Sequence, residues 1–288
     1  MSCELTFKVD VDTLQGYTDG VPRLLDILGK KGIRASFFFS MGPDNSGKVN
    51  HGIFSKCFLA KMLRIKAPVS APMIAASNPD ILKRAVSEGH DCGVRSWDHA
   101  LWRDHLPELT RMEIRDELRR AAELFSDITG TPPKSCAAPG WQVSLDSLSA
   151  QNELEFDYAS DARGISPFLP SVGGTVFRTL QIPTTLPALG ELLGTGGITV
   201  ENVNGHYLDL LEPGLNVHTI HAEVEGCDMS GIFEGLVDCC VDGEMAFPTL
   251  RDVASRFGNA APERAALECG VKMSEVPGRI GKVAVQLR

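Results

Sequence analysis

No stretch of the sequence is both apolar and long enough to cross a bilayer. The longest run without Asp, Glu, Lys or Arg covers residues 164–177, well short of the roughly 20 residues that a spanning helix needs. The first residues show no basic region followed by an apolar core, so no secretion signal is visible. The eight cysteines contain no C-x-x-C pair. Together these absences predict a cytoplasmic protein with reduced thiols.

Basic residues are also fewer than acidic residues. Lys and Arg number 28 against 37 Asp and Glu, so the formal net charge is −9. An acidic surface repels a phosphate backbone, which argues against a nucleic-acid partner. Apolar residues make up 43% and charged residues 23% of the 288 residues, which is typical of a globular domain that needs no disulfides.

Strand-like and helix-like segments alternate along the chain. The expected strands cover residues 5–11, 35–40, 91–94, 135–138, 156–160, 176–182 and 215–222. The expected helices cover residues 21–31, 79–88, 112–128, 186–193, 229–240 and 250–256. This rhythm favours parallel strands wrapped by helices, either as a barrel or as an open doubly wound sheet.

One segment has the opposite charge to the rest of the chain. Between Asp44 and Asp80 there is no acidic residue, and five basic residues give the segment a charge of +5. A basic amphipathic helix can lie on an anionic membrane surface. The residues that would then contact lipid are Phe54, Lys56, Phe58, Lys61 and Arg64. Taken alone, the pattern is explained better by an ordinary helix packed on the domain with its lysines in solvent.

Two carboxylates stand at the end of the first expected strand. Asp10 and Asp12 are two residues apart, so both side chains leave the strand on the same face. In parallel α/β folds, sites form at the carboxyl ends of strands. Two close carboxylates can divide metal binding and general base catalysis between them. A solvated strand end explains a bare D-x-D pattern about equally well.

Two histidines also follow strands. His99 comes just after a short strand, where a lone histidine is more often structural, but a pairing with Asp12 would make it a metal ligand. His221 closes a strand, and a side chain that titrates near neutrality suits general acid catalysis. A hydrogen-bonded structural histidine is at least as good an explanation for His221 on its own.

Further polar or flexible residues follow the next strands. The turn at Gly140 and Trp141 can present backbone N–H groups to an oxyanion, and Asp161 with Arg163 can contact a substrate. An ordinary turn and a solvated ion pair explain these residues when each is taken alone. The specific signal is the joint order of all these groups along successive strand ends.

That order resembles the polysaccharide deacetylase family (carbohydrate esterase family 4). The resemblance runs from about Leu5 to Val285 and rests on FKVDVDT (7–13), GVPRLL (20–25), ASFFFS (35–40), GPDN (42–45), WDH (97–99), YASD (158–161), QIPTT (181–185) and IHAEVEG (220–226). It implies a distorted or incomplete (β/α) barrel of the NodB homology type. The barrel would cover residues 1–258 with a basic amphipathic insertion at about 45–78, and residues 259–288 would form a tail packed on it.

The resemblance also implies an activity, which is metal-assisted amide hydrolysis with a divalent ion of the Zn, Mn or Co class. By position, it assigns Asp10 as the general base, Asp12 and His99 as metal ligands, His221 as the acid for the leaving amine, Gly140 and Trp141 as the oxyanion turn, and Asp161 and Arg163 as substrate contacts.

Within the family, the chain is most similar to enzymes that deformylate undecaprenyl-phosphate-linked 4-deoxy-4-formamido-L-arabinose. Their products are formate and a free amino sugar for lipid A modification, which confers resistance to polymyxin. The lipid tail implies that the protein works peripherally on the anionic cytoplasmic face of the inner membrane. A cell-wall or chitin deacetylase is a weaker alternative, because such substrates lie outside the cell and no secretion signal is visible.

One position departs from the family pattern, because Arg95 stands where the family carries its other histidine ligand. A guanidinium has no accessible lone pair and cannot ligate a cation. Three interpretations remain open. The enzyme recruits another ligand (His90, His105 or Asp98), or it is a metal-poor and weakly active or inactive relative in which Arg95 replaces the ion and pairs with Asp12, or it is an active-site variant. A non-catalytic relative would bind the lipid-linked sugar or a partner enzyme.

Overall fold

The computed structural model describes residues 3–48, 71–258 and 267–287. Their strands form one mixed sheet in the order β11-β10-β6-β8-β5-β4-β3-β2-β1-β9, with β7 paired to β6. The strands are β1 (Cys3–Val11), β2 (Ser36–Phe39), β3 (Asp91–Val94), β4 (Ser135–Cys136), β5 (Tyr158–Ala159), β6 (Phe168–Val172), β7 (Thr175–Val176), β8 (Leu180–Gln181), β9 (Gly214–His221), β10 (Leu267–Glu275) and β11 (Lys282–Gln286).

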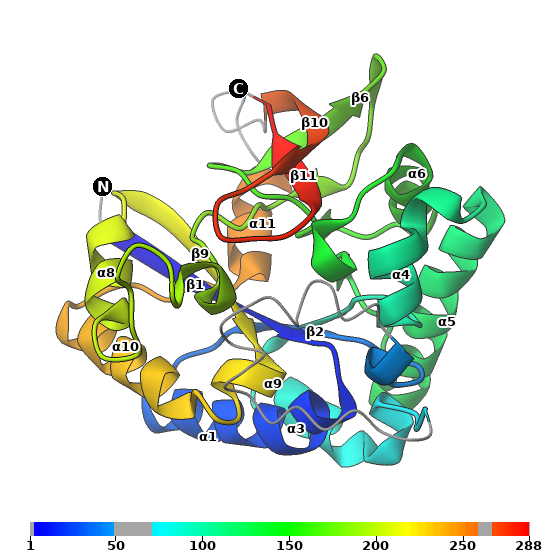
Figure 1. Ribbon diagram of the computed structural model, residues 1–288. Helices are drawn as coiled ribbons and strands as arrows, with labels where there is room; N and C mark the ends of the chain where they lie inside the picture. Colours follow the sequence, from blue (N-terminus) through cyan, green and yellow to red (C-terminus); the bar gives the residue numbers. More distant parts are fainter. Residues whose placement is uncertain (1–2, 49–70, 259–266, 288) are drawn as a thin grey trace.

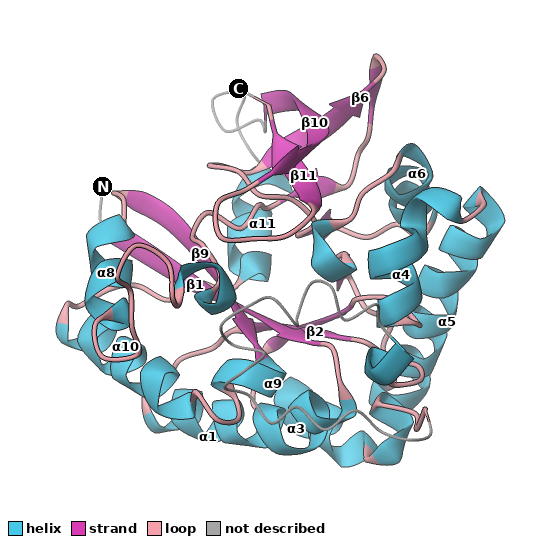
Figure 2. Ribbon diagram, viewed as in Figure 1, coloured by secondary structure: helices cyan, strands magenta, loops and turns pink. Residues whose placement is uncertain are grey.

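The helices cover the curled sheet, most of them around its outside, as Figure 2 shows. They are α1 (Val21–Lys30), α3 (Pro79–Ser87), α4 (His99–His105), α5 (Arg111–Thr129), α6 (Leu145–Glu153), α7 (Leu189–Leu192), α8 (Val203–Leu210), α9 (Ala222–Glu225), α10 (Ser230–Asp242) and α11 (Leu250–Gly258). No helix in these parts of the chain is both long and apolar enough to cross a membrane.

The centre of the sheet is parallel and covered on both faces. Strand β1 pairs in parallel with β2 on one side and β9 on the other, and every residue from position 5 to position 11 is buried. Apolar residues alternate with polar ones along this strand, and both sets are buried, so the polar face also points into the protein, where Lys8 pairs with Asp10. Strands β3, β4, β5 and β8 continue the parallel arrangement.

The sheet curls far enough for its two sides to meet. The segment that follows β8 reaches β9, where the backbone N–H groups of Thr185 and Leu186 both donate to the carbonyl oxygen of Val217 at 3.1 Å. The side-chain oxygens of Thr184 and Thr219 lie 2.8 Å apart beside them. The result is an incomplete (β/α) barrel, visible in Figure 1, and the predicted fold class is confirmed.

Some predicted elements have different bounds in the structure. The strand expected over residues 176–182 is divided into β7 and β8, because the Asn152 side chain accepts hydrogen bonds from the backbone of Arg178 and Thr179 (both 3.0 Å). The helix expected over residues 186–193 begins only at Leu189. Pro187 disfavours helical geometry at the residue before it, which is why Leu186 stays outside α7.

The C-terminal segment extends the sheet. Strand β10 pairs in parallel with β6, and β11 returns antiparallel to β10. Near its end, β11 contacts the main barrel, where the N–H of Arg163 donates to the carbonyl of Ala284 at 2.8 Å. The turn between β10 and β11 is thereby brought toward the carboxyl ends of the central strands. The basic segment predicted to contact lipid lies outside the described residues.

Candidate active site

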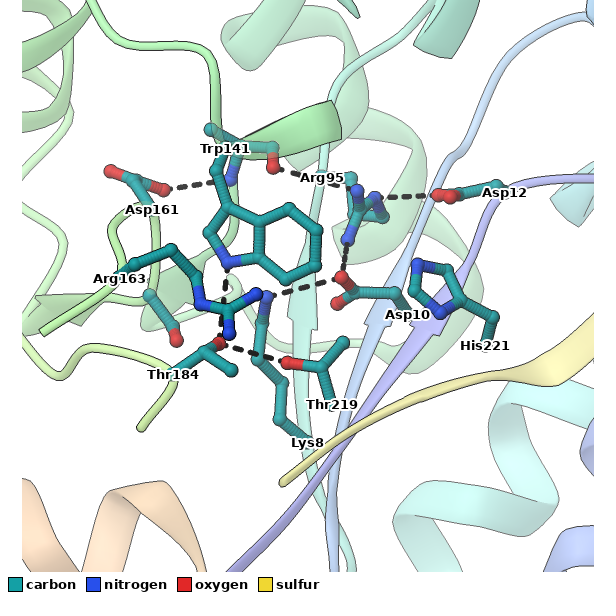
Figure 3. A network of polar contacts seen from close by, with 12 residues as sticks. Lys8, Asp10, Asp12, Arg95, Trp141, Asp161, Arg163, Thr184, Thr219 and His221 are labelled. Atoms are coloured by element: carbon teal, nitrogen blue, oxygen red, sulfur yellow. Dashed lines mark hydrogen bonds and ion pairs between the residues drawn. The ribbon is translucent and has the colours of Figure 1, made fainter. Parts of the chain in front are cut away.

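The predicted catalytic pair lies on two adjacent strands in register. Asp10 on β1 is the direct partner of His221 at the end of β9. Figure 3 shows the His221 ring beside the Asp10 carboxylate. Asp12 follows the end of β1, and His99 is the first residue of α4. The fold therefore brings together, at one edge of the sheet, side chains that are more than 200 positions apart in the sequence.

Arg95 occupies the middle of this group. It follows β3 and its side chain is only 1% exposed. Its Nη1 contacts the Asp10 carboxylate, and its Nε lies 2.7 Å from Oδ1 of Asp12. Its Nη2 donates to the carbonyl oxygen of Ala138 at 3.4 Å. Figure 3 shows the guanidinium bridging the two carboxylates.

A second buried cation shares Asp10. The Nζ atom of Lys8 lies 3.1 Å from Oδ2 of Asp10, and neither side chain is accessible to more than 2%. Burial lowers the pKa of Lys8, although the Asp10 carboxylate opposes the change. Two cations and two carboxylates, Lys8 and Arg95 with Asp10 and Asp12, thus balance one another's charge inside the barrel.

Asp12 also contacts the predicted ligand His99. The Nδ1 atom of His99 lies 3.0 Å from Oδ1 of Asp12. Burial would raise the pKa of Asp12, but the Arg95 guanidinium and His99 outweigh it and hold that pKa well below its usual range. Asp12 is therefore a carboxylate at neutral pH, and Arg95 is its nearest cation.

His221 lies where the strand changes into a short helix. Its backbone N–H donates to the Glu225 carboxylate at 2.9 Å, which ends β9 and begins α9. Glu223 and Glu225 therefore lie on this helical turn. Burial lowers the pKa of His221, and nearby Asp10 opposes that effect. Burial raises the pKa of Glu225 to about 8.

The predicted oxyanion turn has an unusual backbone. Gly140 and Trp141 both have positive φ values, 63° and 54°, and a non-glycine residue such as Trp141 rarely adopts this conformation. The Trp141 N–H donates to the carbonyl oxygen of Ala138 at 3.3 Å, so it is used within the turn. The indole Nε1 donates to Thr184 at 3.2 Å, and the Trp141 ring stands edge-on to His221, 6.2 Å between centroids.

The two residues predicted to contact substrate have different surroundings. Asp161 is fully buried and accepts hydrogen bonds from the N–H of Ala138 (2.7 Å) and from the amides of Gln151 and Gln181. Its hydrogen bond with Ala138 holds the start of the Gly140–Trp141 turn in place. Arg163 donates to both oxygens of Glu191 at 2.9 and 3.0 Å. Its guanidinium lies 5.2 Å from the ring centre of Trp141, which puts it at the site.

The family of this chain follows from its similarity to known proteins. The model of the polysaccharide deacetylase family matches residues 5–159. The chain belongs to the polysaccharide deacetylase family. The family predicted from the motifs is therefore confirmed.

Two curated relatives and one solved structure extend the match. "Probable 4-deoxy-4-formamido-L-arabinose-phosphoundecaprenol deformylase" of Shewanella sediminis (strain HAW-EB3) is 38% identical over 80% of this chain and 79% of its own. The protein of the same name from Wigglesworthia glossinidia brevipalpis is 30% identical over 93% and 96%. A crystal structure described as a probable polysaccharide deacetylase of Pseudomonas aeruginosa PAO1 is 14% identical, with a TM-score of 0.64, over 90% of this chain and 92% of that one.

The deacetylase family is generally metal-dependent, and the described residues of this member do not fit a metal ion. They contain no group of three His, Cys, Asp or Glu side chains that could hold one. Catalytic metal sites usually use three protein ligands. The two candidates here, Asp12 and His99, contact each other directly, and the Arg95 guanidinium joins Asp12 to Asp10. Arg95 places its positive charge between Asp10 and Asp12, where a cation would bind.

The three substitute ligands considered from the sequence are engaged elsewhere. His90 is buried and its Nδ1 accepts from the N–H of Ala35 at 3.1 Å. His105 is exposed and lies 2.9 Å from Glu108. Asp98 caps α4, where its Oδ1 accepts from the first backbone N–H groups of that helix at 3.0 and 3.1 Å. The geometry thus offers no recruited third ligand among the described residues.

The sequence-based reasoning missed three basic residues of the site. Lys8 lies on the same strand face as Asp10 and could have been found from the period of two. Arg103 is on α4, one turn after His99, and α4 itself was not predicted. Arg279 comes from the turn between β10 and β11 and lies 4.7 Å from the ring centre of Trp141. The Pro277-Gly278 dipeptide signals a turn there, but nothing local says that the turn returns to the site.

Proposed function

We propose that this protein acts on undecaprenyl-phosphate-linked 4-deoxy-4-formamido-L-arabinose and hydrolyses its formamide. Water and the formamide would give formate and the free amino sugar, a cationic group for lipid A modification and polymyxin resistance. The observation that carries the proposal is the 38% identity, over four fifths of both chains, to a relative named as such a deformylase. The paired Asp10 and His221 supply groups that this reaction needs.

Each of the two residues has a role that follows from its position. Asp10 would accept a proton from the attacking water, and His221 would donate one to the departing amine nitrogen. Both are reached from the same edge of the sheet because they are register partners. In the arrangement described, Oδ2 of Asp10 is bound by both Lys8 and Arg95, so an attacking water must compete with these two cations for that oxygen. We therefore expect slow turnover.

A second candidate function is binding of the lipid-linked sugar without hydrolysis. The observation that favours it is the buried Arg95 guanidinium, which joins Asp10 to Asp12 and leaves no three-ligand metal site among the described residues. On this alternative the protein would hold the sugar or a partner enzyme, as a metal-poor relative of the deformylases.

The place of action follows from the lipid tail of the proposed substrate. The tail stays in the bilayer, so we propose peripheral attachment to the anionic cytoplasmic face of the inner membrane. The contacts would be Phe54, Lys56, Phe58, Lys61 and Arg64, whose positions the structure does not describe. Attraction of basic residues to anionic lipid is the physical support for this part of the proposal.

One assay separates the two functions. The purified full chain is incubated with the lipid-linked formamido sugar, and formate release and loss of the formyl group are followed by mass spectrometry. We expect formate from the wild-type chain and a loss of about 100-fold or more in His221→Ala. His105→Ala is the matched control, because His105 is exposed and pairs with Glu108, away from Asp10 and His221.

The alternatives give other results. Binding of the substrate with no formate from the wild-type chain would support the second candidate and overturn the first. A wild-type chain that neither binds nor hydrolyses the substrate would overturn both.

A further inference from the structure

Three arginines from distant parts of the chain gather around Trp141. The guanidinium groups of Arg163 and Arg279 lie 5.2 and 4.7 Å from its ring centre. The side chain of Arg103 packs on the neighbouring Gly140, where a Cβ atom would lie 2.6 Å from Cγ of Arg103. Burial lowers the pKa of Arg279, and the positive charges of Arg163 and Arg103 lower it further.

Two arginines of this cluster share one carboxylate. Among the described residues, Glu191 serves two arginines, with hydrogen bonds of 2.9 and 3.0 Å from Arg163 and a longer approach of 3.6 Å from Arg279. Arg103 pairs with Asp104 at 2.8 Å. Two guanidinium groups, those of Arg163 and Arg279, thus share one carboxylate, that of Glu191. A charge excess at such low exposure is unfavourable unless an anion offsets it.

The turn between β10 and β11 holds Arg279 against Trp141 and Glu191. The preceding Gly278 has a φ of +74°, and a Cβ atom there would lie 1.9 Å from the carbonyl oxygen of Glu191. Only glycine allows the turn to approach this closely. The Arg279 side chain is 18% exposed, so it is held against Trp141 and Glu191 and does not extend into solvent.

The cluster lies next to the catalytic pair. The edge-on contact between Trp141 and His221 connects the arginine cluster to the catalytic pair. Arg279 is close enough to His221 to lower the pKa of His221. In the proposed substrate the formamide is on C4 of the sugar and the phosphate on C1, at opposite ends of one ring. A sugar whose formamide is at His221 would therefore direct its phosphate toward the arginines.

We propose that Arg279, with Arg103 and Arg163, binds the anionic phosphodiester of the lipid-linked sugar. Guanidinium groups suit this role because their N–H donors match the geometry of phosphate oxygens. The inference rests on the proposed function and adds to it the group by which a sugar phosphate is distinguished from a neutral sugar.

Two probes test this site by isothermal titration calorimetry on the full chain. One is 4-deoxy-4-formamido-L-arabinose joined through a phosphodiester to a short, water-soluble prenol, and the other is the methyl glycoside of the same sugar. We expect the wild-type chain to bind the phosphodiester at least about tenfold more tightly. Arg279→Gln should remove most of that ratio and leave the affinity for the methyl glycoside unchanged.

Two further variants serve as controls for the Arg279→Gln result. Arg279→Lys keeps the charge and should keep part of the ratio. Arg119→Gln removes an equal charge from the exposed face of α5 and should keep all of it. Equal binding of the two probes by the wild-type chain, or an equal loss of both in Arg279→Gln, would overturn the phosphate site but not the proposed function. Binding of neither probe would overturn both.

Discussion

Arg95 stands at the position where the family resemblance leads us to expect a histidine ligand. Its buried guanidinium joins Asp10 to Asp12 and contacts the turn that carries Trp141. Burial alone would lower the pKa of Arg95, but the two carboxylates outweigh it, so the side chain stays charged. The protein thus supplies, from its own chain, a positive charge between two buried carboxylates.

This role predicts a large effect on stability. Arg95→Met removes the charge and leaves Asp10 and Asp12 buried with less compensation, so the free energy of unfolding should fall by about 3 kcal/mol. Urea unfolding followed by circular dichroism measures it. Arg119→Met, on the exposed face of α5, should leave stability close to that of the wild type, because exposed ion pairs contribute little. A loss below about 1 kcal/mol in Arg95→Met would show that the ion pairs contribute little.

Among single residues, the sequence identified those candidate site residues that stand at the ends of strands. Asp10, Asp12, His99 and His221 could be selected because polar residues at the ends of parallel strands converge. Arg279 could not, because its position depends on packing of the β10–β11 turn against Glu191, a contact that no local pattern encodes. The detailed roles of the selected residues remain predictions.

Among the elements, α4 has the most direct effect on the site because it begins at His99. The Asp98 side chain caps its first turn, and the N–H of Asp98 donates to Glu117 on α5 at 2.7 Å. Burial raises the pKa of Glu117 to about 7. A carboxyl group on one helix therefore fixes the start of another.

The raised pKa gives a pH-dependent contribution with a definite sign. Glu117 binds its proton more tightly in the folded chain than in the unfolded chain, so its contribution to stability is complete below about pH 4.5 and is lost as the pH rises through about 7. Glu117→Gln keeps an acceptor for the N–H of Asp98 and cannot ionise. Between pH 5 and pH 8 the variant should therefore lose less stability than the wild type, by on the order of 2 kcal/mol.

Thermal or urea unfolding at the two pH values provides the comparison. Glu113→Gln, at an exposed carboxyl group in the first turn of α5, is the control and should follow the wild-type profile much more closely. Identical pH profiles for Glu117→Gln and the wild type would contradict the assignment.

The β10–β11 turn offers a matched pair of glycines. Gly278 and Gly281 both have positive φ, +74° and +86°, but only at Gly278 would a Cβ atom meet the backbone, 1.9 Å from the carbonyl oxygen of Glu191. Both alanine variants carry backbone strain of about 1 kcal/mol. Gly278→Ala should in addition displace the turn, and its free energy of unfolding should be lower than that of Gly281→Ala by about 1 to 3 kcal/mol. Equal stabilities would contradict the close docking of the turn.

Some strands were predicted from the sequence and others were not. The buried central strands have apolar sequences and clear helices between them, so β1, β2, β3 and β9 appear near their expected positions. Strands β6, β10 and β11 were not predicted. Most residues of β6 and β10 are partly exposed, and the pairing of these two strands joins distant segments, which leaves little periodic signal.

For the whole molecule, the net charge of −9 is an average of two unlike parts. Residues 45–79 carry +5, and the rest of the chain carries 23 − 37 = −14. A body of that charge is repelled by anionic lipid, so attachment to a membrane would need the basic segment.

Flotation with anionic liposomes tests this attachment. The triple variant Lys56→Glu, Lys61→Glu, Arg64→Glu should lose binding, because each basic residue near the surface contributes about 1 kcal/mol. The triple variant Lys30→Glu, Lys31→Glu, Lys83→Glu makes the same change of charge at exposed positions elsewhere and should bind better than the first. Unchanged binding of the first variant would show that the basic segment is not the contact.

The most direct test of the account is the metal content of the purified chain, measured by inductively coupled plasma mass spectrometry after dialysis against Zn²⁺, Mn²⁺ or Co²⁺. With Arg95 between Asp10 and Asp12, we predict far less than one ion per wild-type chain. We predict about one ion per chain in Arg95→His, together with faster formate release, because the variant would have Asp12, His99 and a third ligand. One tightly held ion in the wild-type chain, or no gain of metal in Arg95→His, would contradict the account.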